Sequence, residues 1–205
     1  MIRTAILLLA LLLAGAPLAE EPLEPAAGRL LVADRSLRDP NFERSVVLLL
    51  AYDENGAMGL IVNRPTEVKL SHALPDVDEG IDGEEPVWFG GPVSPGGMRM
   101  LFRSQHAPKD SEAVLDDVHV SGSRKLLKRL ARLPVPLKVF AGYAGWAAGQ
   151  LDSEIARGDW HVVEGSPDLV FSDEPFRMWQ RLAPPSPRLR TRAGERAESR
   201  SRPAA

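Results

Sequence analysis

The sequence contains no cysteine, and this absence excludes several familiar protein classes. Without cysteine there is no disulfide framework, no Cys–His zinc site and no lipid attachment of the lipoprotein type. Aromatic residues make up only 6% of the 205 residues. The histidines are scattered without the spacing of metal ligands, at His72, His106, His119 and His161. We therefore expect no cofactor and no metal centre.

The short motifs of common chemistries are also missing. There is no phosphate-binding loop ending in Gly-Lys-Ser/Thr, no Gly-x-Gly-x-x-Gly after a strand, no His-Glu-x-x-His and no Gly-x-Ser-x-Gly. No nucleophile with its base is recognisable. We expect the protein not to be an enzyme. If it were one, Tyr143, Gln150 and Asp152 would be its candidate residues.

Positive charge is scarce except at one end. The chain has a net charge of −3, but residues 184–205 hold six Arg and two Glu, which leaves −7 on the rest. This segment has almost no large apolar side chains, so we expect a disordered Arg/Pro-rich tail. The tail is either a solvated extension or a contact to an anionic lipid or an acidic partner. An acidic body lacks the basic face of nucleic-acid-binding domains, so we expect no nucleic acid partner.

Residues 1–19 have the layout of a secretory signal peptide. Arg3 precedes an apolar run from Ala5 to Ala14, and small residues follow. The run is shorter than the ~20 residues that span a bilayer, so we expect no stable membrane anchor. Cleavage is expected after Ala19, with Ala16 as the alternative. The expected location is periplasmic or secreted, or cytoplasmic if the start site is misassigned, and residues 20–28 would form a linker.

The hydrophobic pattern of residues 29–183 predicts one α+β domain with a mostly antiparallel, curved, barrel-like sheet flanked by helices. Its clearest element is a hairpin in which apolar runs at 46–52 and 57–62 flank Asn55-Gly56. Ser121 or Ser123 should cap the first predicted helix, and Ser172 the last. Further strands are predicted at 29–33, 87–91, 98–102, 113–120, 136–143, 160–165 and 168–171, and helices at 121–133, 147–158 and 173–183.

Four stiff loops form a candidate binding surface: DPNFERS (39–45), NRP (63–65), GGPVSP (90–95) and GYAGWAAGQL (142–151). Loops held by glycine and proline lose little entropy on binding. Architecture is the alternative, because the last loop can turn a strand ending near Phe140 into a helix, with Gln150 capping or bridging to a neighbouring loop. The candidate surface comprises Asp39, Asn41, Arg44, Asn63, Arg64, Gly90, Gly91, Gly142, Tyr143, Gly145, Trp146 and Gln150.

Three blocks in order resemble the AlgH/YqgE family of small bacterial proteins: LLVADRSLRDPNFERSVVLLLAYDENGAMGLIVNRPT, FGGPVSP and FAGYAGWAAGQLDSEIARGDW. The resemblance covers residues 29–182 and implies a compact α+β fold with a curved, mostly antiparallel sheet. It implies no reaction; members are called transcriptional regulators because of a link to alginate control in one lineage. Tyr52 and Leu101-Phe102 stand where members commonly have His or Leu-His, and Asp152 replaces Glu. The lost histidines argue against a mechanism built on them.

Three functions remain, and we favour the first. It is a non-enzymatic regulatory or protein-interaction domain, exported and therefore separated from DNA, with a protein partner whose identity the sequence leaves open. The second is a small anionic-ligand-binding domain, in which the N–H groups of Gly90–Gly91 and Gly142–Gly145 surround an anion with Asn63 and Arg64. The third is the enzyme using Tyr143, Gln150 and Asp152. The oligomeric state is left open.

Overall fold

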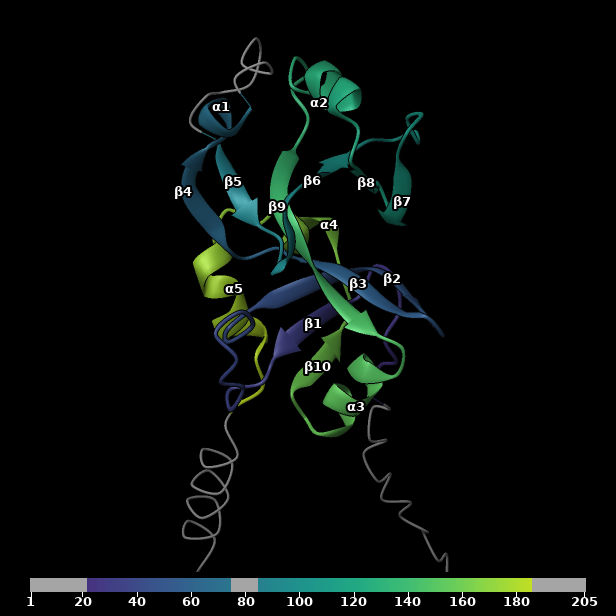
Figure 1. Cartoon of the computed structure of the whole chain (residues 1–205), viewed down its shortest axis with the longest axis vertical. Coiled ribbons are helices and arrows are strands. Elements are labelled where there is room, and N and C mark those ends of the chain that lie inside the picture. Colours follow the sequence, from purple (N-terminus) through teal and green to yellow (C-terminus); the bar gives the residue numbers. More distant parts are fainter. Residues whose placement is uncertain (1–21, 75–84, 186–205) are drawn as a thin grey trace, which may run out of the picture.

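One long strand, β9 (Leu137–Ala147), runs through the molecule and joins its two halves (Figure 1). The computed structural model describes residues 22–74 and 85–185, so the predicted signal peptide and residues 186–205 of the predicted tail lie outside the described residues. The other strands are β1 (Leu30–Ala33), β2 (Val46–Asp53), β3 (Gly56–Ile61), β4 (Pro65–Lys69), β5 (Pro86–Phe89), β6 (Val93–Arg103), β7 (Glu112–Leu115), β8 (Val118–Ser121) and β10 (Trp160–Val163). The helices are α1 (Leu70–Ala73), α2 (Arg124–Leu130), α3 (Gln150–Ala156), α4 (Pro167–Val170) and α5 (Pro175–Leu182).

The strands form one ten-stranded sheet in the order β10-β1-β2-β3-β9-β6-β8-β7, with β5 also pairing β9 and β4 pairing β5. Every pairing is antiparallel except β5 with β9. The first half of β9 pairs with β5 and β6, and its second half pairs with β3. The α+β class and the mostly antiparallel sheet are confirmed, and the described strands do not close the sheet.

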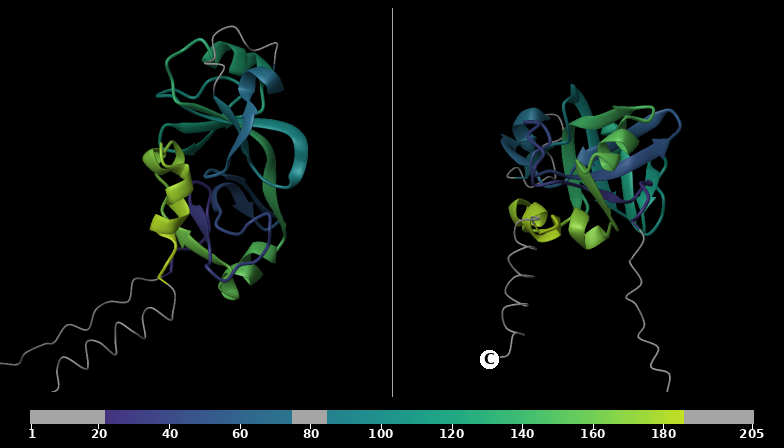
Figure 2. Two further views of the ribbon diagram at one scale, coloured as in Figure 1. Left: turned by 90° about the vertical axis from the view of Figure 1, so that its left-hand side faces the viewer. Right: turned by 90° about the horizontal axis from the view of Figure 1, so that it is seen from below.

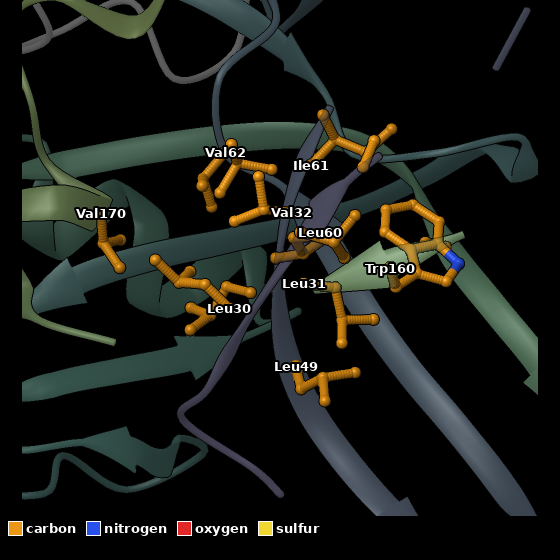
Figure 3. Close-up of a cluster of buried hydrophobic side chains, with 14 of the residues drawn as sticks. Leu30, Leu31, Val32, Leu49, Leu60, Ile61, Val62, Trp160 and Val170 are labelled. Atoms are coloured by element: carbon orange, nitrogen blue, oxygen red, sulfur yellow. The ribbon is translucent and has the colours of Figure 1, made fainter. Parts of the chain in front are cut away.

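Two hydrophobic clusters lie on this sheet. The larger one packs β1, β2 and β3 against the helices that follow β9, and Figure 3 shows part of it, including Leu31, Leu60 and Trp160. The smaller one packs α1 and α2 onto β5, β6 and β9. Neighbouring residues of β6 belong to different clusters: Leu101 packs in the larger cluster, and Met100 and Phe102 pack in the smaller one. The reason is that successive side chains of a strand point to opposite faces of the sheet. Figure 2 shows α4 and α5 beside the sheet.

Several predicted elements are confirmed. The hairpin forms with Asp53 opposite Gly56, and the helices predicted at 121–133, 147–158 and 173–183 appear as α2, α3 and α5. Ser123 caps α2, since its side chain accepts a bond from the Leu126 N–H. Within the predicted linker, the Gly28 N–H already donates to the Leu49 carbonyl at 2.9 Å.

Other predictions are wrong. Residues 168–170 belong to α4 and Phe171 is its C-cap, so no strand forms there, because Pro167 starts a helical turn that Ser166 caps. The N-cap of α5 is Glu174, not Ser172. Residues 113–120 are extended as predicted but form two strands, β7 and β8, instead of one, and half of the predicted 90–95 loop, residues 93–95, is inside β6 at an irregular register.

The strand predicted to end near Phe140 also continues to Ala147. Gly142 has a left-handed φ of 69° within the strand, and the turn into α3 is made at Gly149, which has the same φ. Among the described residues, no helix is long and apolar enough to cross a membrane.

Candidate functional site

The 39–45 loop is held by the two polar residues that follow β3. The buried Asn63 accepts a bond from the Val46 N–H at its Oδ1 (2.8 Å) and donates from Nδ2 to the Arg44 carbonyl (3.0 Å). Arg64 donates from Nη1 and Nη2 to the carbonyls of Asn41 and Glu43, both at 2.5 Å. Burial lowers the pKa of Arg64 from its ordinary value. These side chains therefore satisfy backbone groups of the loop.

The same loop sets the direction of Arg44. Asp39 opens it by accepting a bond from the Asn41 N–H at 2.7 Å. Arg44 itself has a φ of +56°, in the left-handed region that non-glycine residues seldom adopt. Its guanidinium carbon lies 5.9 Å from the ring centroid of Trp179 on α5. The loop thus projects an exposed arginine onto an aromatic ring.

The glycines of the other two loops let backbones touch. A Cβ at Gly91 would lie 2.3 Å from the Tyr143 carbonyl carbon, and one at Gly142 would lie 2.3 Å from the Gly91 carbonyl oxygen. The Gly90 N–H already donates to the Ala141 carbonyl at 2.9 Å. Tyr143 pairs with Val93 in the sheet, and Gly145 packs beneath its ring. The loop after β5 and the middle of β9 are therefore in direct backbone contact.

Trp146 and Gln150 belong to a cluster around one carboxylate. Glu154 Oε2 accepts bonds from the indole N–H groups of Trp146 and Trp160, both at 2.8 Å. Gln150 donates to Glu154 Oε1 at 2.9 Å and accepts from the Ala147 N–H at 3.1 Å, so it caps locally. Phe42 packs on both indoles, with centroids 6.0 Å and 5.6 Å away. This cluster ties the 39–45 loop to α3.

The twelve residues of the predicted surface therefore fall into three groups instead of one pocket. The loop group is the 39–45 loop with Asn63 and Arg64, the glycine group is Gly90, Gly91 and Gly142 to Gly145, and the tryptophan group is Trp146 and Gln150 around Glu154. Phe42 links the loop group to the tryptophan group. Tyr143, Gly145 and Trp146 line only a shallow hollow of about 470 Å³ with Asn55. The hydrogen bonds and close packing described above assign most of these residues to holding the fold.

A cleft of about 970 Å³ lies elsewhere. It is bounded by β4 and β5, by the connection from α2 to β9, and by the segment joining α4 to α5. We call it the Lys138 cleft. Its lining residues are Pro65, Leu70, Glu85, Pro86, Trp88, Arg103, Leu130, Ala131, Leu133, Val135, Pro136, Leu137, Lys138, Val139, Asp168, Phe171, Ser172, Asp173, Glu174 and Pro175.

Lys138 is only 7% exposed in the wall of this cleft. Its Nζ donates to the Val170 carbonyl at 2.8 Å and lies 3.7 Å from the ring centroid of Trp88. Burial lowers the pKa of Lys138 to about 8, although Asp173 and Glu85 act in the opposite direction. Trp88 Nε1 is buried without a hydrogen-bond partner among the described residues. The cleft thus joins a cation to an aromatic wall.

The rim of the Lys138 cleft combines acidic and exposed apolar groups. Four carboxylates line it, at Glu85, Asp168, Asp173 and Glu174, against the cations Arg103 and Lys138. Leu133 on the rim is 51% exposed, and Phe176, next to Pro175, is 75% exposed. Val68 on β4, between two residues of the lining, is 51% exposed. An exposed large apolar side chain in the wall of a cleft, such as Leu133 here, is typical of an interaction site.

No catalytic arrangement emerges from the candidate enzyme residues. Asp152 accepts a bond from the Tyr52 hydroxyl at 2.5 Å, and this bond raises the pKa of Tyr52. Gln150 is occupied by Glu154, as described above. Within residues 22–74 and 85–185, no three His, Asp or Glu side chains gather as a metal site.

Sequence reasoning missed the Lys138 cleft because its walls come from five distant segments. One signal was available: Lys138 interrupts the apolar strand PLKVF, where a charged residue needs a specific partner. Trp88 and Phe171 have no such signal, since aromatic residues in apolar runs are ordinary core residues.

Comparison with known proteins gives consistent matches. The family model described as DUF179, AlgH-like, matches residues 30–185. A UPF0301 protein of Streptomyces coelicolor is 42% identical over 166 residues, covering 76% of this chain and 83% of the relative. A UPF0301 protein of Chlorobium luteolum is 35% identical over 174 residues, covering 83% and 87%.

Two solved structures are similar in fold. The solution structure of the AlgH protein from Pseudomonas aeruginosa superposes with a TM-score of 0.60 at 25% identity, covering 91% of this chain and 100% of that one. A crystal structure of a protein from Corynebacterium diphtheriae has a TM-score of 0.71 at 24% identity, covering 82% and 92%. The names of these relatives and structures specify no reaction.

Proposed function

The chain belongs to the AlgH-like family, and we propose that it works by binding, as an exported, non-enzymatic protein-interaction domain with a regulatory role. The observation that carries the proposal is the position of the exposed apolar side chains. Leu133 lines the Lys138 cleft and is half-exposed, and the exposed Phe176 directly follows the lining residue Pro175 in sequence. Leaving such side chains in water is unfavourable, and a partner that covers them gains that free energy.

The partner segment has a definite chemistry. Its apolar side chain enters between Leu133 and Phe176, over the wall made by Trp88 and Phe171. The carboxylates of the rim outnumber its cations, and Asp168 is already within 3.6 Å of Arg103 Nη1. We therefore infer that the segment carries Lys or Arg beside its apolar anchor, since opposite charges at a rim steer and orient a partner.

Export is the second part of the proposal. It rests on the signal-like segment at residues 1–19. An exported chain has no access to DNA, so regulation would act through an envelope protein. Sequencing the N-terminus of the protein purified from its host tests this part: a start at Glu20 supports export, and a start at Met1 contradicts it.

Site-specific photo-cross-linking tests the interaction role. A photo-reactive phenylalanine analogue is placed at position 176 or 133, and a matched control carries it at the exposed position 54 on the β2–β3 turn. We expect positions 176 and 133 to capture the same protein and position 54 to capture none. Asp173→Asn combined with Glu85→Gln should reduce the capture.

The cross-linked peptide decides the chemistry of the partner. Mass spectrometry should place the cross-link on a segment with an apolar side chain next to Lys or Arg. Capture of different proteins at 176 and 133, equal capture at 54, or an acidic target segment would contradict the proposal.

A further inference from the structure

A second hollow, of about 600 Å³, lies between the segment after β1, the 43–44 corner and α5. Three arginines line it, Arg35, Arg38 and Arg44, together with Trp179. It shares no lining residue with the Lys138 cleft. The combination of three guanidinium groups and one aromatic ring is the feature that needs explanation.

The arginines are positioned by the ring and by the backbone. The guanidinium carbons of Arg35 and Arg44 lie 5.0 Å and 5.9 Å from the Trp179 ring centroid. The ring is fixed, because Trp179 Nε1 donates to the Ala33 carbonyl at 2.7 Å. Arg35 is further held by bonds from Nε and Nη2 to the carbonyls of Pro184 and Ala183. Such cation–π contacts orient a guanidinium while leaving its edge able to donate.

Arg44 has the most unused hydrogen-bonding capacity. Within residues 22–74 and 85–185, no acceptor or carboxylate pairs with its guanidinium, and its contact is the Trp179 ring. Arg38 uses Nη1 for the Arg35 carbonyl at 3.1 Å. A guanidinium carries five N–H donors, so both arginines keep donors for a ligand.

The two carboxylates of the hollow are already engaged. Asp34 Oδ1 accepts bonds from the N–H and hydroxyl of Ser36, and Oδ2 lies 2.7 Å from His161 Nε2. Burial raises the pKa of Asp34, but these bonds outweigh it and bring the pKa down to about 2. Glu43 interacts electrostatically with Arg64, which donates to its carbonyl. The arginines are therefore only partly compensated.

Backbone strain points to the same place. Arg44 is held at a φ of +56° by the bond from the buried Asn63 to its carbonyl, at a position where glycine would fit without strain. Strained conformations persist at sites where the side chain has a task. The strain places the guanidinium over Trp179, and a glycine would supply no such group.

We propose that this hollow is an anion-binding site for a phosphate group, with Arg44 as its main ligand and Arg38 and Arg35 completing the set. A phosphate is preferred to a carboxylate because it presents more oxygens and up to two charges to three arginines. The phosphate comes either from a soluble phosphate ester or from a phospholipid headgroup. The site goes beyond the proposed interaction role and does not depend on it.

Binding of inorganic pyrophosphate to the full chain, measured by titration calorimetry, tests the site. Arg44→Gly is the decisive variant, because it removes the guanidinium and relieves the strained φ. We expect its affinity to fall about tenfold or more, with a melting temperature equal to or above that of the wild type. Arg99→Gln is the matched control, since Arg99 lines a different hollow and its guanidinium carbon lies 4.8 Å from the ring centroid of Tyr143. Its affinity should stay within about twofold.

Parallel arms identify the source of the phosphate. Vesicles of phosphatidylglycerol are compared with vesicles of phosphatidylcholine. Arg44-dependent binding to the anionic vesicles assigns the site to a lipid headgroup, and binding to pyrophosphate alone assigns it to a soluble ester. Three results would overturn the proposal. They are no binding of pyrophosphate or of phosphatidylglycerol vesicles when either supplies phosphate groups at about 10 mM, an unchanged affinity in Arg44→Gly, and binding of succinate as tight as that of pyrophosphate.

Discussion

At the scale of single residues, Glu154 stabilises the region that the sequence marks most strongly. Its carboxylate accepts two indole N–H bonds and one amide N–H bond. Hydrogen bonds to a charged acceptor contribute about 1.5–3 kcal/mol each. We therefore expect Glu154→Ala to lower the free energy of unfolding by about 3 kcal/mol and Glu154→Gln by about 1 kcal/mol, since Gln keeps one acceptor. Chemical denaturation measures both, and a loss below that of Glu54→Ala would refute this role.

Lys138 makes a pH-dependent contribution to stability. Burial lowers its pKa to about 8 in the folded chain, against an ordinary 10.5. Between these values the unfolded chain binds more protons at this residue, so the folded state gains stability as pH rises and carries the full cost of the buried charge below pH 8. Relative to Lys138→Met, the wild type should gain about 3 kcal/mol between these pH values. A difference between the two proteins that does not change with pH would contradict this.

At the scale of elements, the contact between β9 and the loop after β5 depends on glycine at one position more than at another. Gly142 and Gly149 have the same φ of 69°, but only a Cβ at Gly142 meets a backbone atom, the Gly91 carbonyl oxygen. Gly149→Ala should therefore cost about 1 kcal/mol, the ordinary penalty of left-handed alanine. Gly142→Ala should cost about 3 kcal/mol or more, because strands must also separate. Equal losses in urea denaturation would show that the close approach is unimportant.

Helix α5 has two faces with different roles. Met178 and Trp179 are buried in the larger cluster, while Phe176, the residue after Pro175 of the Lys138 cleft, is exposed. Phe176→Ser should leave the melting temperature unchanged, because exposed side chains contribute little to stability. The same change should weaken capture of the partner from position 133 by about tenfold. A fall in melting temperature together with binding would make the residue structural.

How far the sequence predicts an element depends on whether its signal is local. The β2–β3 hairpin was predictable, because turn-forming residues between two apolar runs mark a reversal, although the turn is made by Glu54 and Asn55, and Gly56 already begins β3. The length of β9 was not, because three glycines suggest a corner unless it is known that β3 and β6 pair along the whole strand. The segment DLVF at 168–171 was wrongly predicted as a strand, since four residues rich in apolar side chains fit a strand as well as the helical turn of α4.

At the scale of the whole molecule, the residues that identify the family and the surface proposed to bind are largely different. The glycine and tryptophan groups fix where β9 crosses the sheet and how α3 returns to it. Their positions were readable from the sequence, but their roles as backbone contacts and hydrogen-bond donors required the pairing. The Lys138 cleft is assembled from five distant segments, so its composition follows only from the topology.

We propose that the partner binds at the Lys138 cleft. The most direct measurement is the change in backbone amide chemical shifts of the labelled protein when the purified cross-linked partner is added. We expect the largest changes at residues 85–88, 133–139 and 168–176, with the 142–150 segment nearly unaffected. The largest changes at 142–150 and 90–91, with none around Lys138, would contradict the claim and return the binding role to the glycine loops.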